Sequence, residues 1–463
     1  MPALKARTSM HRQSGVPAES RLVDWARGLA PLASLYRRLP LAWRDAVSQL
    51  SNRRLQRRLS FRRTSAWAAG LSAPPQAMLP AVPQSPAGEG IGVNVFGYLR
   101  GEFGLGESAR QYARALMAAG VDVALVDMDL GLPHGWKDDS LGALLGTRAP
   151  FPVNLVFVNP DYLDAALERI GAERLAGKYL IACWFWELDR VPDAWIPALD
   201  KVDELLVSSR FVEDAFRKVT DKPILRAPLP LSHMPDSGLQ RGDFGLPEEG
   251  FVFLASFDFN SWIARKNPYA VVEAFLRAFS ASSEPVVLLL KTSNGFRYPT
   301  QLRALLAAAS ADPRIVVRDD IIERAHMTAL HRCCDAYVSL HRAEGFGLGL
   351  AEAMALGKPV IATNWSGNLD FMSSDVACMV DFRRVPVEQG QYPHFEGATW
   401  AEPDVASAAA AMRRLAADPS AALRLGARAC EHVSGELAPQ RTASVIRRRL
   451  QELQPVQRDG GGS

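Results

Sequence analysis

The stretch LHRAEGFGLGLAEAM, at residues 340–354, connects an expected strand to an expected helix and decides the fold class. An apolar run at residues 335–339 precedes it and predicts a short buried strand. The helix is expected over residues 348–356, and Gly357 ends it. Residues 358–363 then begin another apolar run, which predicts the next strand. A strand, a glycine-rich turn, a helix and a further strand indicate an open α/β sheet.

Two carboxylates flank this turn. Glu344 lies on the loop and Glu352 lies about one turn into the helix, with seven residues between them. Open α/β sheets bind ligands at the carboxyl ends of their strands, and a helix N-terminus offers unpaired N–H groups to oxygen atoms. Because carboxylates accept hydrogen bonds from hydroxyl groups, the pair suits a polyol ligand. The alternative is an ordinary strand-to-helix turn with an incidental pair of glutamates.

The segment resembles the Glu-x7-Glu motif of family-4 retaining glycosyltransferases, and the resemblance extends over roughly residues 90–455. That family has the GT-B fold, an α/β fold in which two Rossmann-like domains face a cleft. The resemblance implies that Glu344 contacts the sugar of a nucleotide-sugar donor and that Glu352 contacts the ribose. It also implies retention of the anomeric configuration through attack on the front face of the sugar.

Length and charge bound the organisation of the chain. At 463 residues it exceeds one ordinary hydrophobic core, so two or three domains are expected. The net charge is +3, but the first 70 residues hold 13 arginines and one lysine against three acidic residues. That excess of 11 positive charges leaves −8 for the remainder.

The cysteines and the apolar runs bear on location. The five cysteines form no Cys-x-x-Cys pair, which favours buried thiols in a reducing compartment over disulfides or a zinc site. No run of 18 apolar residues predicts a membrane-spanning helix, and the N-terminus lacks the apolar core of a signal peptide. We therefore expect a cytoplasmic protein, peripheral on the inner face of the membrane if its basic end binds lipid.

Residues 1–71 are expected to form a basic, partly helical extension. Apolar residues near helical spacing alternate with arginines; they are Trp43, Val47, Leu50, Leu55 and Leu59. This pattern is typical of a helix on an anionic membrane surface, which would involve residues 1–70. It is equally typical of a cap packed on the body of the protein. Nucleic-acid binding is disfavoured because no recognised nucleic-acid module follows.

The rest of the chain divides by pattern. Residues 72–88 hold five prolines and predict an extended linker. Strand-like and helix-like runs alternate over residues 89–228 and 229–435, which predicts two Rossmann-like domains. The resemblance implies that the N-terminal domain binds the acceptor and the C-terminal domain binds the nucleotide-sugar. The resemblance implies that a helix at residues 436–455 crosses back to the first domain. Residues 456–463 are expected to be a flexible tail.

Local signals set several element boundaries. Ser108 is expected to cap a helix over residues 108–119. One continuous helix is expected over residues 161–175. Residues 381–401 are expected to form a loop because of their proline and glycine content.

A second glycine-rich turn, GEFGLGES at residues 101–108, joins the first expected strand to the first helix. Its glycine order differs from the G-x-G-x-x-G of dinucleotide sites, so a nicotinamide cofactor is disfavoured. Gly104 and Gly106 would still let phosphate or sugar oxygens approach a helix N-terminus. The resemblance implies that this loop reaches the donor phosphates and sugar; the alternative is a tight turn without a ligand.

Two adjacent cations, Arg265 and Lys266, precede a helix expected from Pro268. Because a helix N-terminus is partly positive, the cations should repel there unless an anion is bound. The resemblance implies that both stabilise a diphosphate leaving group, on which charge builds up in the transition state. Lys291, at the end of the next expected strand, is expected to join them. The alternative is a solvated pair of charges.

The acceptor side is expected in the segment CWFWELD, at residues 183–189. Trp186 would stack on a sugar ring, and Glu187 would accept hydrogen bonds from hydroxyl groups. Many relatives carry a histidine at about this strand end, and Glu187 or a backbone group is expected to replace it here. Aromatic core packing is the alternative. His134 is a further acceptor candidate; the alternative is that it is a solvated loop histidine without a role.

Further donor contacts are expected from backbone groups. Gly347 lies in the first motif, and Gly367 lies in the turn TNWSGNLD at residues 363–370, where relatives often have two glycines and a later glutamate. Both are expected to offer N–H groups to the donor. No metal site is expected, because the one Asp-x-Asp spacing considered, Asp127 to Asp129, lies outside the donor half.

These expectations define a hexosyltransferase (EC 2.4 type). It would move a hexose, with mannose favoured, from GDP-mannose or UDP-glucose to a lipid-linked saccharide acceptor in surface polysaccharide or glycoconjugate synthesis. No cofactor or nucleic-acid partner is expected. The alternative is a catalytically silent GT-B scaffold that binds sugars or a partner transferase, against which the intact charged residues argue. A phosphorylase is disfavoured because no pyridoxal-phosphate lysine motif stands out.

Overall fold

The computed structural model describes residues 34–69 and 91–453, apart from Arg37, Pro133, Ser232, His233 and Ala281. The linker expected at residues 72–88 and the tail expected at 456–463 lie outside the described residues. So do the first 33 residues of the extension. Among the residues described, no helix combines the length and apolar character that crossing a membrane requires.

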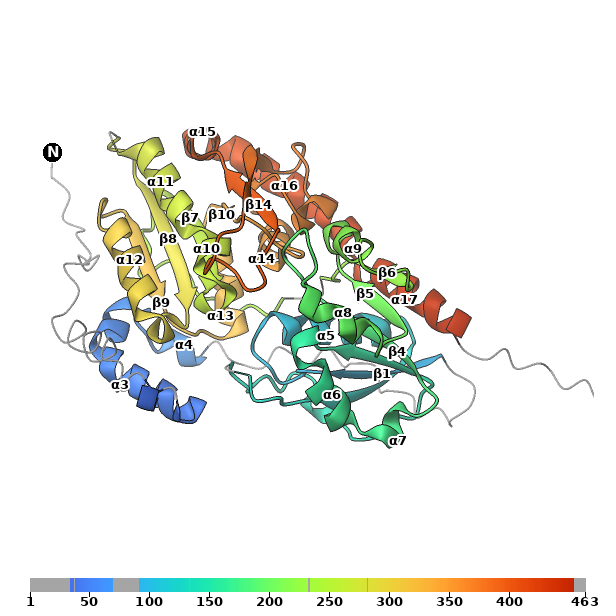
Figure 1. Cartoon of the computed structure of the whole chain (residues 1–463). Coiled ribbons are helices and arrows are strands. Elements are labelled where there is room, and N and C mark those ends of the chain that lie inside the picture. The colour runs from blue at the N-terminus through green and yellow to red at the C-terminus, as the bar shows by residue number, and fades with distance from the viewer. Residues whose placement is uncertain are drawn as a thin grey trace, which may run out of the picture.

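The first domain is built on a six-stranded parallel sheet (Figure 1). Its strand order is β2-β1-β3-β4-β5-β6. The strands are β1 (Gly92–Gly97), β2 (Asp122–Asp127), β3 (Val153–Phe157), β4 (Tyr179–Cys183), β5 (Glu204–Val207) and β6 (Ile224–Arg226). The helices are α5 (Gly104–Ala118), α6 (Leu163–Ile170), α7 (Ala172–Leu175), α8 (Ile196–Leu199) and α9 (Arg210–Phe216). β1, β3 and β5 are buried throughout, as expected of strands covered on both faces.

The second domain repeats this plan with the strand order β12-β11-β10-β7-β8-β9. The strands are β7 (Phe251–Asp258), β8 (Val286–Ser293), β9 (Ile315–Asp319), β10 (Ala336–Ser339), β11 (Val360–Thr363) and β12 (Cys378–Val380). The helices are α10 (Ile263–Lys266), α11 (Pro268–Phe279), α12 (Pro299–Ala309), α13 (Arg324–Cys333), α14 (Leu348–Ala355), α15 (Val405–Ala417) and α16 (Pro419–Glu436). Two Rossmann-like α/β domains are confirmed.

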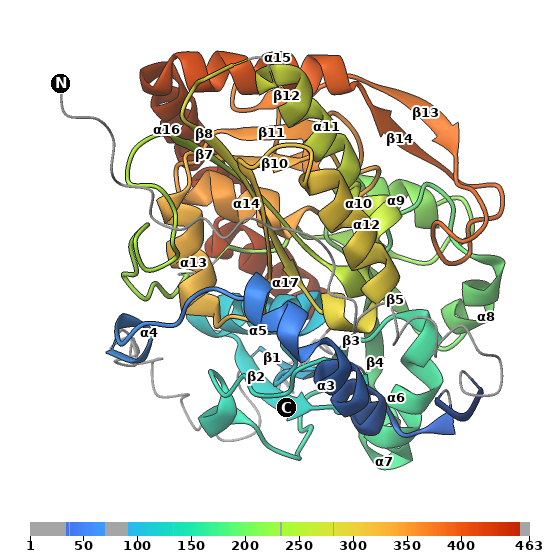
Figure 2. The ribbon, with the colours of Figure 1, turned by 90° about the vertical axis from the view of Figure 1, so that its left-hand side faces the viewer.

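The last helix, α17 (Pro439–Leu453), follows the second domain in sequence and packs along α5 of the first (Figure 2). Thr442 Oγ1 donates to the carbonyl oxygen of Pro228 at 2.8 Å. Arg449 forms a 2.9 Å ion pair with Glu204, which is buried on β5. α17 therefore ties the second domain to the first.

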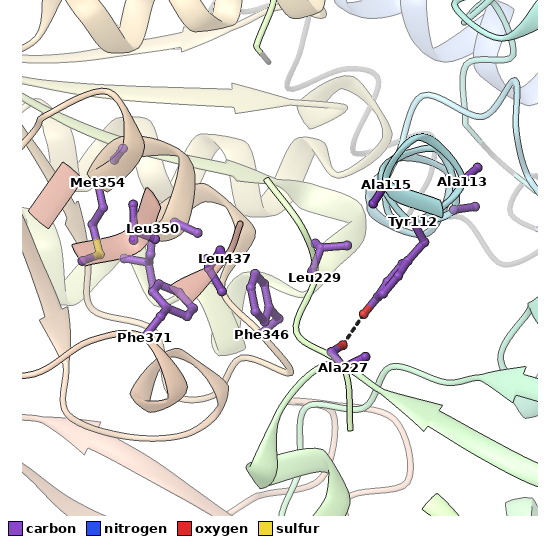
Figure 3. Close-up of a cluster of buried hydrophobic side chains, with 14 of the residues drawn as sticks. Tyr112, Ala113, Ala115, Ala227, Leu229, Phe346, Leu350, Met354, Phe371 and Leu437 are labelled. Carbon is purple, nitrogen blue, oxygen red and sulfur yellow. Dashed lines mark hydrogen bonds between the residues drawn. The ribbon is translucent and has the colours of Figure 1, made fainter. Parts of the chain in front are cut away.

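A shared apolar cluster also joins the domains (Figure 3). Tyr112 on α5 donates to the carbonyl oxygen of Ala227 at 2.6 Å. Phe346, beside the Glu344 loop, packs against Phe371 with their ring centroids 5.0 Å apart. Because buried side chains from both domains belong to this cluster, apolar burial stabilises their relative placement.

The described part of the extension packs on the second domain. It comprises α3 (Leu41–Leu59) and α4 (Ala66–Ala69). Leu55 and Leu59 are buried in the core of the second domain. Asp45 forms a 2.6 Å ion pair with Arg297. This part of the extension therefore packs on the body as a cap, which was one of the two alternatives. A different face of α3 stays exposed.

Two expected helices differ from the structure. α5 begins at Gly104, four residues before Ser108, and no side chain caps it. Ser108 Oγ instead donates to the carbonyl oxygen of Gly104 inside the helix, so the expected N-cap is wrong. The single helix expected over residues 161–175 is interrupted by Gly171, which has a φ of +85°.

The loop expected at residues 381–401 is also wrong in part. An antiparallel hairpin forms there from β13 (Phe382–Pro386) and β14 (Thr399–Pro403). The proline and glycine that indicated a loop fall in the connection between the strands, which reaches toward the first domain (Figure 2). We call residues 382–403 the hairpin arm.

Candidate active site

The Glu344 loop follows β10 and is fixed by the turn that follows β11. The backbone N–H of Glu344 donates to Ser366 Oγ at 2.8 Å, and the carbonyl oxygen of Glu344 accepts from the N–H of Gly367 at 2.9 Å. Gly347 precedes α14 with a φ of +97°, a conformation that glycine adopts readily. Glu344 and Glu352 are both buried. The turn therefore places Glu344, but the N–H of Gly367 bonds the loop itself, contrary to the expectation that it is offered to the donor.

Glu344 is held by the two expected cations. Its Oε2 lies 3.0 Å from Arg265 Nη1, and its Oε1 accepts from Lys266 Nζ. Burial alone would raise the pKa of Glu344, but the charges of Lys266 and Arg265 outweigh it and hold the pKa at about 2. The carboxylate is therefore ionised near neutral pH, which suits a charged clamp better than a proton carrier.

The cations lie at a helix end. Arg265 and Lys266 close the short helix α10, and Asn267 separates them from α11 with a φ of +51°. α11 begins at Pro268, as expected, so the cations lie both at the end of α10 and just before the start of α11. The expected need for an external anion was wrong, since Glu344 supplies the negative charge. Burial lowers the pKa of Lys266, and Glu344 opposes that shift.

Glu352 meets a residue that sequence reasoning missed. Arg324, the first residue of α13, donates to Glu352 Oε1. The same guanidinium lies 3.9 Å from Glu107 of the first domain, beside the turn that holds Gly104 and Gly106. A Cβ on Gly106 would come within 2.4 Å of the carbonyl oxygen of Gly101, so this turn needs a glycine there. The signal in the sequence was an arginine in the short connection between a strand and a helix, five positions after the end of β9.

Lys291 does not join the cation pair. Its Nζ donates to the carbonyl oxygens of Thr292, at 2.8 Å, and of Asp320, so it lies at the ends of β8 and β9. Burial lowers its pKa to about 8, against the opposing charges of nearby aspartates. The expected contribution of Lys291 to the cation cluster is therefore wrong.

The acceptor candidates separate in the structure. Trp186 is buried and packs on Trp195, with ring centroids 4.6 Å apart, so core packing was the correct alternative for it. His134 stacks on Phe103 at 4.2 Å, next to the first glycine-rich turn rather than at the strand end that bears Trp186. Glu187 does reach the charged cluster, with its Oε1 3.7 Å from Arg265 Nη2.

The hairpin arm positions Glu187. Tyr392 in the arm donates to Glu187 Oε2 at 2.7 Å, and Arg265 lies over the Tyr392 ring at 5.9 Å. Thr399, also in the arm, donates to Asp189 of the first domain. The arm therefore bridges the domains beside Glu344. Sequence reasoning placed Tyr392 in a loop, where it lies, but no local signal shows that this loop reaches Glu187.

Comparisons with known proteins bear on the fold of both domains. Residues 251–418 match the model of the family described as Glycosyl transferases group 1. The match lies within the second domain and spans all six strands of its sheet. Across both domains the chain is similar in structure to sucrose-phosphate synthase from Thermosynechococcus elongatus, with a TM-score of 0.57 and 16% identity over 78% of this chain and 98% of that one. No curated protein matches it.

A second structural neighbour is HepE of Anabaena, solved with UDP and glucose. Its TM-score is 0.57 at 13% identity, over 78% of this chain and 100% of that one. Both likenesses concern the fold, since the identities are low. The GT-B fold expected from the sequence is confirmed.

The second domain lies against the first at Gly345. A Cβ there would lie 2.7 Å from the carbonyl oxygen of Trp186, and Ser209 Oγ donates to the carbonyl oxygen of Gly345. A side chain at this position must push the Glu344 loop away from the end of β4.

Gly345→Ala is therefore expected to lower activity by about tenfold, because a small displacement of a positioned group has a large effect on turnover. Activity and melting temperature should be measured together. Gly435→Ala on α16 is the matched control: no atom lies within 4 Å of its Cβ, so it should keep full activity. Full activity of Gly345→Ala would show that the close contact is not required.

Proposed function

We propose that the protein is a retaining glycosyltransferase that moves a hexose from a nucleotide-sugar to a saccharide acceptor. The observation that carries the proposal is the buried cluster in which Arg265 and Lys266 of the second domain meet Glu344, with Glu187 of the first domain beside them. It combines a carboxylate for sugar hydroxyls with cations for phosphate, at a boundary between two Rossmann-like domains.

Each residue has a role in this proposal. Arg265 and Lys266 neutralise the diphosphate as the bond to the sugar breaks, which is where charge develops. Glu344 accepts hydrogen bonds from the hydroxyls of the transferred sugar, and Glu352 accepts them from the ribose. Glu187 faces the acceptor, in place of the histidine of many relatives. The two cations supply the positive charge, so the reaction as proposed uses no metal ion or other cofactor.

The donor is proposed to be GDP-mannose or UDP-glucose. Mannose is favoured by the resemblance of the sequence motif, whereas the Anabaena neighbour HepE was also solved with UDP-glucose, at a TM-score of 0.55. The acceptor is proposed to be a lipid-linked saccharide on the cytoplasmic side of a membrane, in surface polysaccharide or glycoconjugate synthesis.

Incubation with radiolabelled donors and a membrane extract tests the activity. Transfer of label from GDP-mannose or UDP-glucose into lipid-extractable saccharide is expected. A catalytically silent scaffold is separated by donor hydrolysis: the native chain should exceed Glu344→Ala, whereas equal rates would favour the scaffold. Transfer from no nucleotide-sugar would refute the proposal.

The exposed face of α3 is proposed to contact an anionic membrane. Trp43, Val47 and Leu50 follow helical spacing and are 66%, 44% and 69% exposed. The buried face, with Leu55 and Leu59, lies on the opposite side, so packing on the second domain does not account for these three side chains. Exposed arginines continue along α3 toward its C-terminal end, including Arg53, Arg57 and Arg58. Aromatic and aliphatic side chains with arginines beside them match a surface of anionic lipid.

Replacing both Trp43 and Leu50 by serine should lower binding to phosphatidylglycerol vesicles by about tenfold or more, because two large side chains no longer enter the interface. Raised salt should also weaken binding of the native chain by screening the arginines. Leu423→Ser on α16, where the side chain is 68% exposed, is the control and should change nothing. Equal vesicle binding by the double variant and the native chain would contradict the membrane contact.

A further inference from the structure

A chain of charged groups joins the two domains at Glu352. Arg324 Nη2 donates to Glu352 Oε1, and the same nitrogen lies 3.9 Å from Glu107 Oε1 on the first domain. One guanidinium therefore faces a carboxylate from each domain. The motif that contains Glu352 does not predict this partner, because Arg324 lies at the start of a different helix, α13.

Glu107 leads from Arg324 to the first glycine-rich turn. Its Oε2 pairs with Arg110 Nη2 at 2.8 Å, and Arg110 is buried. Arg110 Nη1 in turn donates to the carbonyl oxygens of Leu99 and Gly101, at 3.1 and 2.8 Å. These contacts fix the backbone ahead of Gly104 and Gly106. The turn of the first domain is thus connected to Glu352 through three ionic side chains in series.

This chain of contacts is charged at neutral pH. Burial alone would raise the pKa of Glu107, but Arg324 and Arg110 outweigh it and hold the pKa at about 2. Arginine is always protonated and presents a planar fork of donors, which lets one guanidinium serve two carboxylates. A lysine would carry the charge without that geometry.

Glu352 keeps capacity for a ligand. Within the part of the chain that the structure describes, Arg324 occupies Oε1, and no hydrogen bond is shown at Oε2. An ionised carboxylate has about four lone-pair sites, so one bond to an arginine leaves room for hydroxyl donors. The Arg324 side chain itself is one-third exposed.

We propose that Arg324 is the positioning residue of Glu352: it fixes the carboxylate so that its free oxygen receives the ribose hydroxyls of the donor. Through Glu107 and Arg110 it also couples ribose binding to the glycine-rich turn of the first domain. The inference rests on the proposed function, in which Glu352 binds the ribose.

Calorimetry with ribose and dideoxyribose nucleotides tests the inference. UDP and GDP are compared with their 2′,3′-dideoxy counterparts on the native chain, which should bind the ribose form of one pair more tightly. Arg324→Gln should weaken that ribose form by about tenfold, the effect of a lost charged hydrogen bond, and change the dideoxy form by less than about twofold. Arg324→Lys should fall between Arg324→Gln and the native chain.

Two further variants sharpen the test. Glu107→Gln should act in the same direction but less, and the double variant with Arg324→Gln should be no worse than Arg324→Gln alone, because the two residues act as a unit. Arg332→Gln is the matched control: Arg332 lies on the same helix, α13, and pairs with Asp236 instead. It should leave both affinities unchanged.

The outcomes separate the two proposals. If the native chain binds the ribose and dideoxyribose nucleotides equally, or binds neither, this result would overturn the role of Glu352 and the inference with it. A native preference for ribose that survives intact in Arg324→Gln would overturn the inference alone. So would an equal loss for both forms, which would indicate a general charge effect. If Arg324→Gln does not fold, judged by its melting temperature, Arg324→Lys decides by the same criteria.

Discussion

Glu344→Gln is expected to lower the turnover of the nucleotide-sugar by about a hundredfold or more, the scale found when a positioned electrostatic group is removed. Glutamine keeps the size of the side chain but removes the charge that orders Arg265 and Lys266. Arg265 is buried and would keep Glu187, 3.7 Å away, the carbonyl oxygen of Ala343 and the Tyr392 ring, but no carboxylate in close contact. Stability should therefore also fall, by about 3 kcal/mol.

Asp335→Asn is the matched control for that loss of stability. Asp335 pairs with Arg241 at 2.6 Å just before β10, at the opposite end of the strand that leads to Glu344. This variant should lower the melting temperature while turnover stays within about twofold, since no positioned group of the site is lost. Equal turnover of Glu344→Gln and the native chain would show that Glu344 takes no part in the reaction.

The pH dependence of the stability loss follows from the charge of Glu344. Its pKa falls from 4.5, the ordinary value of a glutamate, to about 2 in the folded chain. The ionised form is thus favoured by folding, so its contribution is full above about pH 4.5 and is lost as the pH falls toward 2. Unfolding experiments should show a difference between the native chain and Glu344→Gln that is constant near neutral pH and shrinks in acid.

Lys266→Met is expected to have the second-largest effect, again about a hundredfold on turnover, because one of two cations at the leaving group is lost. Arg265 still pairs with Glu344 in this variant, so the fold should be retained. Affinity for UDP or GDP should fall more than affinity for the corresponding nucleoside, since only the diphosphate meets the cation. Kinetics and calorimetry on one preparation give both values.

Lys358→Met serves as the control for a lost lysine. Lys358 Nζ donates to the carbonyl oxygen of Arg332 at 2.7 Å, away from the charged cluster. Turnover and diphosphate affinity should both stay within about twofold of the native chain. If Lys266→Met weakened nucleoside and diphosphate equally, Lys266 would not be the leaving-group cation.

Local patterns predicted the parts of the site that are close in sequence. Glu344 and Glu352 stand at the two ends of one strand-turn-helix unit, and the cations follow a strand, so a regular α/β unit brings each to a strand end. The roles given to them came from the resemblance to a family. The first turn shows the limit of local signals: α5 begins at Gly104 without a capping side chain, so Ser108 was the more visible but wrong start.

Contacts between distant segments could not be predicted in this way. Tyr392 and Glu187 are 205 positions apart, and their hydrogen bond exists only because the hairpin arm crosses to the first domain. Sequence alone left open whether Trp186 stacks on a sugar or packs in the core, and Trp195 and the arm bury it. Arg324 reaches Glu352 from another helix, 28 positions earlier. The Tyr392–Glu187 bond depends on how the two domains pack, and the Arg324–Glu352 bond depends on how two helices of the second domain pack. No single motif encodes either arrangement.

The central claim is that Glu344 and Glu352 hold opposite ends of one donor. Calorimetry of UDP and GDP with Glu352→Gln and Glu344→Gln tests it directly. Glu352→Gln should weaken the better-bound nucleotide by about tenfold, since a charged hydrogen bond to the ribose is lost. Glu344→Gln should not weaken nucleotide binding. UDP and GDP carry no transferred sugar for Glu344 to bind, and both cations remain available to the diphosphate. Equal weakening by both variants, or none by Glu352→Gln, would contradict the account.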